Sequence, residues 1–243
     1  MNLTGRNALV TGGATRVGKA LTLALAGAGA NVFVHYNSSS GPAEETAAEV
    51  RALGRAAATG AANLSDPSVG SQLISDATEA LGPISVLVNS ASGFPKDTLA
   101  DATLDGFKAA LDLTLASPVF LTQAYVAALP EEMDGAVVNV TDVKTMRPYK
   151  DHFSYVIAKG GIDTFTRAAA RFLAPRIRVN AVALGVILAP PGEDDFYVDK
   201  LASKLPMKRV GGTQPVAAAM MALIENDFVT GEIIRVDGGG HLE

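Results

Sequence analysis

Tyr155 and Lys159 place a phenol and an ammonium four residues apart in a stretch of helical period. At that spacing the two side chains lie on one face of a helix. A cation beside a phenol favours the phenolate, which lowers the tyrosine pKa towards values useful for general acid–base catalysis. Such pairs also occur on helices by chance, so the hypothesis depends on what the rest of the chain places beside this one.

A glycine-rich turn follows the first predicted strand and opens the first predicted helix. It runs from Thr11 to Gly18 and contains Gly12 and Gly13. Glycines at such a turn let backbone N–H groups approach a pyrophosphate, and the helix N-terminus adds partial positive charge. Many α/β proteins use glycine there only for tight packing, but the position at the first strand-to-helix crossing favours a dinucleotide site.

The second predicted strand ends in a polar segment without a carboxylate, from His35 to Ser40. A site that prefers NAD usually places Asp or Glu here to bind the ribose 2′-hydroxyl. Hydroxyls, an amide and a helix N-terminus would instead hydrogen-bond a 2′-phosphate, so the segment favours NADPH or NADP over NAD. The alternative is that Ser38 to Ser40 only form a polar turn before Pro42.

Short β-rich runs alternate with longer Ala- and Leu-rich stretches of helical period, which is typical of βαβ units with a parallel sheet. The predicted strands are Asn7–Thr11, Asn31–Tyr36, Ala56–Gly60, Ser85–Asn89, Ala136–Val140, Arg178–Val182 and Glu232–Val236. The predicted helices are Val17–Ala28, Ala43–Leu53, Pro67–Leu81, Asp105–Leu129, Tyr155–Leu173 and Gln214–Glu225. We therefore expect an α/β fold in one domain over residues 1–243: doubly wound, with a mostly parallel seven-stranded sheet and helices on both faces.

Two long predicted loops leave the carboxyl edge of this sheet, Ala91–Thr103 and Gly185–Asp199. Open α/β folds bind ligands at that edge, so both loops are candidate walls of a substrate pocket. The second loop contains Pro190 and Pro191 before an acidic run, and it is interpreted either as a mobile lid or as a solvated surface loop.

The composition excludes several classes of function. The 243 residues are 48% hydrophobic and 19% charged, which is enough apolar material for a sizeable core. Without cysteine there is no disulfide scaffold, thiolate metal site or cysteine nucleophile. A net charge of −5 disfavours nucleic acid and anionic membranes as partners. The sequence shows neither a signal peptide nor a membrane-spanning run, so we expect a cytoplasmic protein.

Taken together, these features resemble the short-chain dehydrogenase/reductase family over essentially the whole chain. The resemblance rests on the glycine turn, Tyr155 with Lys159, the run Asn89-Ser90-Ala91, and the segments 177–182 and 229–239. It implies a Rossmann-type fold, NAD(P) across the carboxyl edge of the sheet, Tyr155 exchanging the proton, and Lys159 binding the nicotinamide ribose. The cofactor-binding residues that it implies are Gly12, Thr15, Arg16, Val17, Gly18, Tyr36, Asn37, Ser38, Ser39, Asn63, Leu64, Asn89, Ala91, Tyr155, Lys159, Gly185 and Ile187.

Three departures from the common family pattern look like the pteridine reductase branch, which includes dihydromonapterin- and dihydropteridine-type reductases. Arg16 stands where most of the family has glycine, and Asp142 stands where most have a serine. Ser92 and Phe94 lie in a run that replaces the usual Asn-Ala-Gly. The resemblance implies that Arg16, Ser92 and Phe94 line the pterin site and that Asp142 joins Tyr155 and Lys159 in catalysis.

The chemistry of a carboxylate supports this branch independently. A carboxylate beside a carbonyl oxygen that becomes an alkoxide raises the barrier, so Asp142 is a poor replacement for serine in ketone reduction. In reduction of a ring C=N bond the nitrogen must gain a proton, which Asp142 could relay through Tyr155 or water. Phe94 could stack a flat ring on the nicotinamide, and Arg16 could donate to a pterin carbonyl and to phosphate. In the alternative, Phe94 anchors its loop, Arg16 contacts only phosphate and Asp142 caps a turn.

Other positions also depart from the family pattern. Thr114 stands where many relatives have an asparagine that holds a water in the proton relay, and Asn63 replaces an aspartate near the adenine. Thr114 can still hydrogen-bond a water, so we expect a relay that is slower or differently routed. The three histidines have no metal-ligand spacing, so no metal is predicted, and they are interpreted as structural or surface residues: His35, His152 and His241.

The apolar residues between Ala116 and Leu129 occupy more than one helix face. This pattern indicates burial by a partner subunit as well as by the sheet, and burial within its own subunit is the alternative. The family resemblance implies a homotetramer.

The sequence therefore predicts an NADPH-dependent reductase of a ring C=N bond in a pterin-like small molecule, with Tyr155 as proton donor assisted by Lys159 and Asp142. One alternative is an NADPH-dependent carbonyl reductase of 3-oxoacyl or sugar-like substrates. Another is an NADPH-binding regulatory protein that has lost catalysis, a hypothesis motivated by Thr114 and Asn63.

Overall fold

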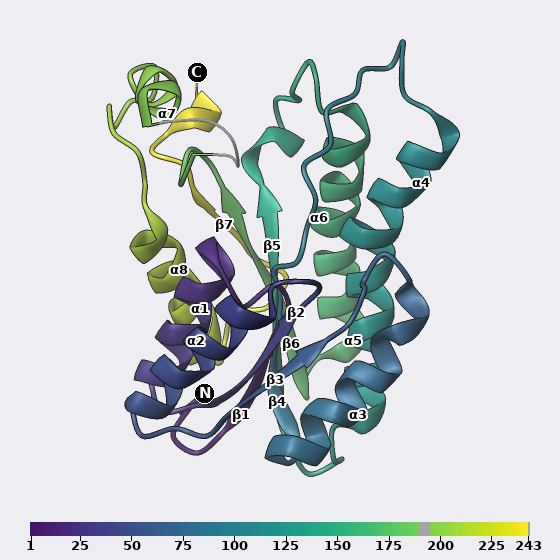
Figure 1. The fold of residues 1–243 in the computed structure, drawn as a ribbon, viewed down its shortest axis with the longest axis vertical. Helices are drawn as coiled ribbons and strands as arrows, with labels where there is room; N and C mark the ends of the chain where they lie inside the picture. The colour runs from purple at the N-terminus through teal and green to yellow at the C-terminus, as the bar shows by residue number, and fades with distance from the viewer. Residues whose placement is uncertain (190–194, 243) are drawn as a thin grey trace.

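Seven parallel strands form one sheet in a computed structural model that describes residues 1–189 and 195–242. Their order is β3-β2-β1-β4-β5-β6-β7 (Figure 1). The order reverses between β1 and β4, the switch point at which doubly wound folds bind ligands, so the predicted Rossmann-type fold is confirmed. The strands are β1 (Asn7–Val10), β2 (Asn31–Tyr36), β3 (Ala57–Ala61), β4 (Ile84–Asn89), β5 (Gly135–Asp142), β6 (Ile177–Leu184) and β7 (Ile233–Val236).

Helices cover both faces of the sheet (Figure 1). One face carries α1 (Arg16–Gly27), α2 (Ser40–Ala52) and α8 (Thr213–Glu225). The other carries α3 (Gly70–Leu81), α4 (Leu104–Leu111), α5 (Ser117–Ala128) and α6 (Phe153–Leu173). The short helix α7 (Asp195–Ala202) lies near the C-terminus, and 3-10 turns occur at Pro67–Val69, Val143–Thr145 and Gly240–Leu242. None of the helices described is long and apolar enough to cross a bilayer.

The continuous apolar strands are explained by two cores, one on each face of the sheet. Val10 belongs to the core under α1 and α8, and its neighbour Leu9 belongs to the core under α3 and α5. The same alternation relates Val34 to Phe33 on β2. Since successive side chains of a strand point to opposite faces, a strand buried on both faces is apolar at most of its positions.

The predicted helix Asp105–Leu129 is wrong as a single α-helix. A π-helical segment at Asp112–Ala116 separates α4 from α5. Such a segment adds a residue within one turn and leaves the apolar composition unchanged, so periodicity alone could not reveal it. The segment presents Leu113 to the cavity described below, and Thr114 is buried within it.

The predicted loop over 185–199 is also corrected at its end, because α7 begins at Asp195. An eight-residue helix has only about two turns, which is too short for its helical period to be separated from a loop. Residues 190–194, where the lid was expected, lie outside the described residues.

Candidate active site

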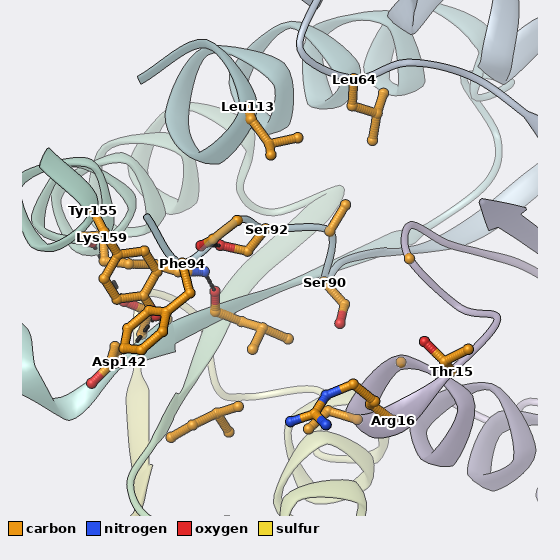
Figure 2. A pocket seen from close by; sticks show the side chains of 18 of the residues that line it. Thr15, Arg16, Leu64, Ser90, Ser92, Phe94, Leu113, Asp142, Tyr155 and Lys159 are labelled. Atoms are coloured by element: carbon orange, nitrogen blue, oxygen red, sulfur yellow. Dashed lines mark hydrogen bonds between the residues drawn. The ribbon is translucent and has the colours of Figure 1, made fainter. Parts of the chain in front are cut away.

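A cavity of about 670 Å³ opens at the carboxyl ends of the strands, beside the switch point between β1 and β4. Its lining comes from the turn between β1 and α1, the segments after β2, β3, β4 and β6, the end of β5 and helix α6, together with Leu113 and Tyr149 (Figure 2). It brings together most of the residues that the sequence predicted: Gly12, Thr15, Arg16, Val17, Gly18, Asn37, Asn63, Leu64, Ala91, Ser92, Phe94, Asp142, Tyr155, Lys159, Gly185 and Ile187.

The glycine turn is packed so closely that its glycine positions leave no room for a side chain. Gly12 has φ +62°, and a Cβ there would lie 3.1 Å from the Cα of Ala91. A Cβ on Gly18 would lie 2.0 Å from the Gly12 carbonyl oxygen. The Thr11 hydroxyl accepts the Ala91 N–H over 3.0 Å, which ties the turn to the end of β4. A backbone cradle of this kind, opening a helix, fits the phosphates of a dinucleotide.

Arg16 reaches across one side of the cavity. Its backbone is in the left-handed region, with φ +53°, and its guanidinium donates to the Ala189 carbonyl over 2.6 Å. Figure 2 shows Arg16 beside Thr15, across the cavity from Asp142 and Tyr155. Arg16 therefore bridges the glycine turn and the segment after β6, and contact with substrate or phosphate stays a prediction.

The end of β2 brings only one of its four predicted residues to the cavity. Asn37 lines it, whereas the partly buried Tyr36 packs against the core under α1. Ser38 and Ser39 precede α2 outside the cavity lining, and the Ser39 side chain makes no capping hydrogen bond. Their role in holding a 2′-phosphate stays a prediction.

A short hydrogen-bond cluster joins the end of β5 to the first turn of α6. The Tyr155 hydroxyl donates to Asp142 Oδ2 over 2.9 Å. The other Asp142 oxygen, Oδ1, accepts the Lys144 backbone N–H over 2.8 Å, so the carboxylate both caps the turn after β5 and faces the tyrosine. Burial raises the pKa of Asp142 above its ordinary value, although its hydrogen-bond donors and the Lys159 charge act in the opposite direction.

The prediction that Lys159 lowers the tyrosine pKa is wrong. Burial and the Asp142 charge raise the pKa of Tyr155 well above its ordinary value. The Lys159 ammonium donates to the Val140 carbonyl over 2.7 Å and lies 5.8 Å from the Tyr155 ring centroid. The sequence indicated that Asp142 acts beside Tyr155, but not that burial and the Asp142 charge would outweigh the cation in setting the tyrosine pKa. Tyr155 therefore holds its proton, as a proton donor must.

The charged form of the Lys159 side chain is disfavoured by its burial. Burial lowers its pKa to about 8, while the charges of Asp142 and Asp163 act to raise it. Asp163 accepts hydrogen bonds from Thr141 and Thr145, over 2.6 and 2.7 Å. Its carboxylate therefore fixes the backbone on either side of Asp142 and adds negative charge near Lys159.

Aromatic rings gather beside this cluster. Phe94 stacks on His152, with ring centroids 3.6 Å apart and planes 18° apart. It meets Tyr155 and Tyr149 edge to face, at 4.8 and 5.5 Å between centroids. Phe94 is still 40% exposed, so a flat ligand can reach it. The neighbouring Ser92 hydroxyl lies 3.5 Å from the Thr114 hydroxyl.

Asn89 is one predicted site residue whose side chain the structure does not bring to the cavity. It is buried, and its Nδ2 donates to Asn139 Oδ1 over 2.8 Å. Asn139 in turn donates to the Thr166 hydroxyl over 2.9 Å. This chain links β4, β5 and α6 and holds together the strands that end at the site.

Among the residues that were not predicted from the sequence, three lie beside the cluster of Asp142, Tyr155 and Lys159. Tyr149 lines the cavity and donates to Asp142 Oδ2 over 3.4 Å, and nothing but its position after β5 pointed to it. His152 was interpreted as structural or surface, and it is a buried residue in contact with Phe94. Asp163 lies four residues after Lys159, so helical spacing could have found it.

Comparisons with known proteins agree with this architecture. A family model described as "Enoyl-(Acyl carrier protein) reductase" matches residues 12–241. A 3-oxoacyl-[acyl-carrier-protein] reductase of Synechocystis sp. is 34% identical over 242 residues, covering 98% of this chain and 97% of that protein.

Solved structures are similar over the whole chain. FolM alternative dihydrofolate reductase 1 from Brucella canis, complexed with NADP, has a TM-score of 0.95 and 35% identity, and the match covers 100% of this chain and 96% of that one. A short chain dehydrogenase from Burkholderia cenocepacia, in complex with NADP, has a TM-score of 0.91 and 30% identity over 98% of this chain and 99% of that one. With its parallel sheet, glycine turn and Tyr155–Lys159 pair, the chain belongs to the short-chain dehydrogenase/reductase family.

Proposed function

We propose that the chain is an NADPH-dependent reductase that transfers a hydride to a ring C=N bond of a pterin-like substrate, of the dihydropteridine, dihydromonapterin or dihydrofolate type. The observation that supports it best is the 2.9 Å hydrogen bond from Tyr155 to the buried carboxylate of Asp142, beside the exposed ring of Phe94. It places an acidic group at the proton donor, next to an aromatic surface.

The cofactor proposal rests on the glycine cradle and on the family. NADPH would supply the hydride when bound. We assign its pyrophosphate to the turn between Gly12 and Gly18, where the packing at both glycines leaves no room for a side chain. Lys159 would hold the nicotinamide ribose. Two of the solved neighbours are complexes with NADP, in agreement with the predicted cofactor.

The proton steps follow from the two buried acids. The raised pKa of Tyr155 keeps the phenol protonated, so it can donate to a ring nitrogen as the neighbouring carbon gains hydride. The raised pKa of Asp142 lets this carboxyl carry a proton at a higher pH than an exposed aspartate does. When Asp142 is protonated it can pass this proton to the Tyr155 phenolate along their shared hydrogen bond, and the carboxylate takes its next proton from water at the cavity that it lines. Phe94 offers a face on which a flat heterocycle stacks.

The second candidate is an NADPH-dependent carbonyl reductase. The 3-oxoacyl-[acyl-carrier-protein] reductase among the relatives favours it. Against it stands Asp142, because a carboxylate near a developing alkoxide opposes the charge that the reaction creates.

Substitution of Asp142 separates the two candidates. NADPH oxidation is followed with dihydrobiopterin, dihydromonapterin and dihydrofolate, and with a 3-oxoacyl ester. We expect Asp142→Ser to lower kcat/KM for the pterin by about a hundredfold, the contribution of a general acid, and to leave or raise the rate with the ester. Asp76→Ser, on the exposed surface of α3, is the control and should change neither. Turnover of the ester alone by the wild-type protein would reject the pterin proposal.

We also propose that the protein assembles as a homotetramer. Phe120 on α5 and Phe172 on α6 are 50% and 86% exposed, and exposed aromatic residues on helices indicate a covering partner. Light scattering of the purified protein measures the assembly, and a monomer at micromolar concentration would contradict it.

A further inference from the structure

We propose that His152 and Asp97 are positioning residues that latch segment 91–97, and with it the Phe94 ring, to the first turn of helix α6. The inference rests on the proposed function in one respect, that Phe94 faces the flat ring of the substrate. It goes further by identifying what fixes that ring relative to Tyr155.

Asp97 joins the far end of the segment to the helix. Its Oδ1 accepts the Ser154 backbone N–H over 3.1 Å, and its Oδ2 accepts the Ser154 hydroxyl. The Asp97 carbonyl accepts the Phe153 N–H over 3.1 Å, and the Asp97 N–H donates to the Asp151 carbonyl over 3.2 Å. The carboxylate and the carbonyl of Asp97 thus each satisfy one N–H group that a helix N-terminus leaves unpaired, and the charge of the carboxylate suits that end of the helix dipole.

His152 joins the middle of the segment to the same turn. Its Nδ1 lies 2.7 Å from the Pro95 carbonyl, and since a carbonyl only accepts, Nδ1 carries the proton. The imidazole stacks on Phe94 at 3.6 Å, and it is only 4% exposed. One ring therefore holds both the backbone and the aromatic side chain of the segment.

The latch matters because the middle of the segment has no regular secondary structure to hold it. Residues 91–96 belong to no helix or strand, and Phe94 itself is 40% exposed. His152 stands one helical turn before Tyr155, so the distance between the Phe94 ring and the proton donor is set within a single rigid element. For a substrate stacked on Phe94, the position of this ring sets the distance from the substrate to Tyr155. Hydride and proton transfer both depend on how the substrate is positioned.

Two substitutions at His152 separate its two contacts. Asparagine carries an N–H donor near the position of Nδ1 but has no ring, and phenylalanine keeps a ring but has no donor. With dihydrobiopterin as the probe, we expect each to lower kcat/KM roughly threefold to tenfold, the effect of one aromatic pair or one hydrogen bond. The change should come mainly through KM, because Tyr155 and Lys159 are untouched.

A double-mutant cycle with Phe94 tests positioning directly. If His152 acts through the Phe94 ring, His152→Asn has no further effect on KM once Phe94→Ala is present. A merely structural role would give additive losses, and it would weaken NADPH binding as well. The dissociation constant for NADPH, measured by fluorescence titration, should stay within about twofold in all variants. Additive losses, or a parallel loss of NADPH affinity, would overturn the proposal.

Asp97→Asn tests the other half of the latch without any substrate. Amide hydrogen exchange of residues 91–97 should become faster in this variant, and exchange in β4 and β5 should not change. Asp101→Asn is the matched control, because the Asp101 carboxylate accepts its hydrogen bonds from Thr98, within its own turn. Unchanged exchange in Asp97→Asn, or an equal increase in the control, contradicts the latch. Failure of the wild-type protein to reduce any pterin contradicts the proposed function and leaves the exchange result standing.

Discussion

The cofactor side and the proton-transfer side of the cavity are built on opposite principles. At Gly12 and Gly18 of the glycine turn, backbone lies against backbone with no room for a side chain. The cluster around Asp142 consists of buried polar side chains whose pKa values are displaced by their neighbours. Substitutions should therefore act through steric exclusion on the first side and through charge on the second.

Gly18→Ala should have the largest effect, since its Cβ would lie 2.0 Å from the Gly12 carbonyl oxygen, which cannot move without opening the turn. We expect a loss of about 3 kcal/mol or more in the free energy of unfolding and about a hundredfold weaker NADPH binding. Gly27→Ala in the same helix has nothing within 4 Å of its Cβ and should stabilise the protein by at most about 1 kcal/mol. Denaturant unfolding and NADPH titration measure both. Similar results for the two variants would show that the turn tolerates side chains.

On the proton-transfer side, substitution of Asp163 is expected to have an intermediate effect, which appears in the pH dependence of the reaction. The pKa of Lys159 is about 8, so the cation is lost as the pH rises through 8, and kcat/KM for NADPH should fall there. The Asp163 charge raises this pKa, and Asp163→Asn should therefore move the alkaline limb of the profile to lower pH. Asp163→Glu retains the charge and should leave the limb in place. A limb that moves to higher pH in Asp163→Asn would contradict the electrostatic account.

The smallest effect is expected at Arg16, where a substitution changes both the backbone strain of the glycine turn and the charge of the cavity wall. Its φ of +53° favours glycine, so Arg16→Gly should raise the free energy of unfolding by up to about 1 kcal/mol. The same change removes a cation from the cavity wall, and we expect KM for dihydrobiopterin to increase. Lys208→Gly, at φ +52° and outside the cavity lining, should give the stability gain alone. An unchanged KM in Arg16→Gly would remove Arg16 from the substrate site.

The cofactor side could be predicted from the sequence because it depends on local patterns. Alternating strands and helices place the glycine turn at the switch point, and a residue without a Cβ marks each close approach of the backbone. Tyr155 and Lys159 were found for the same reason, since their spacing of four residues fixes their relation within one helix.

The proton-transfer side could be predicted only in part because its contacts join segments that are distant in sequence. Phe94 meets His152 and Tyr149 across more than fifty residues, and no periodicity encodes such a contact. The direction of the Tyr155 pKa was wrong because burial and the contact with Asp142 outweigh a cation 5.8 Å from the ring. The π-helical segment near Thr114 was missed because it leaves the apolar pattern intact.

Helix α6 holds Tyr155 and Lys159 in its own turns and holds Phe94 through the contacts of His152. A thermal displacement of this helix against the sheet moves all three together. The distances between these three side chains therefore fluctuate less than the position of each side chain relative to the sheet. If α6 and segment 91–97 both had high atomic displacement parameters, the distances between Phe94, Tyr155 and Lys159 would still vary little.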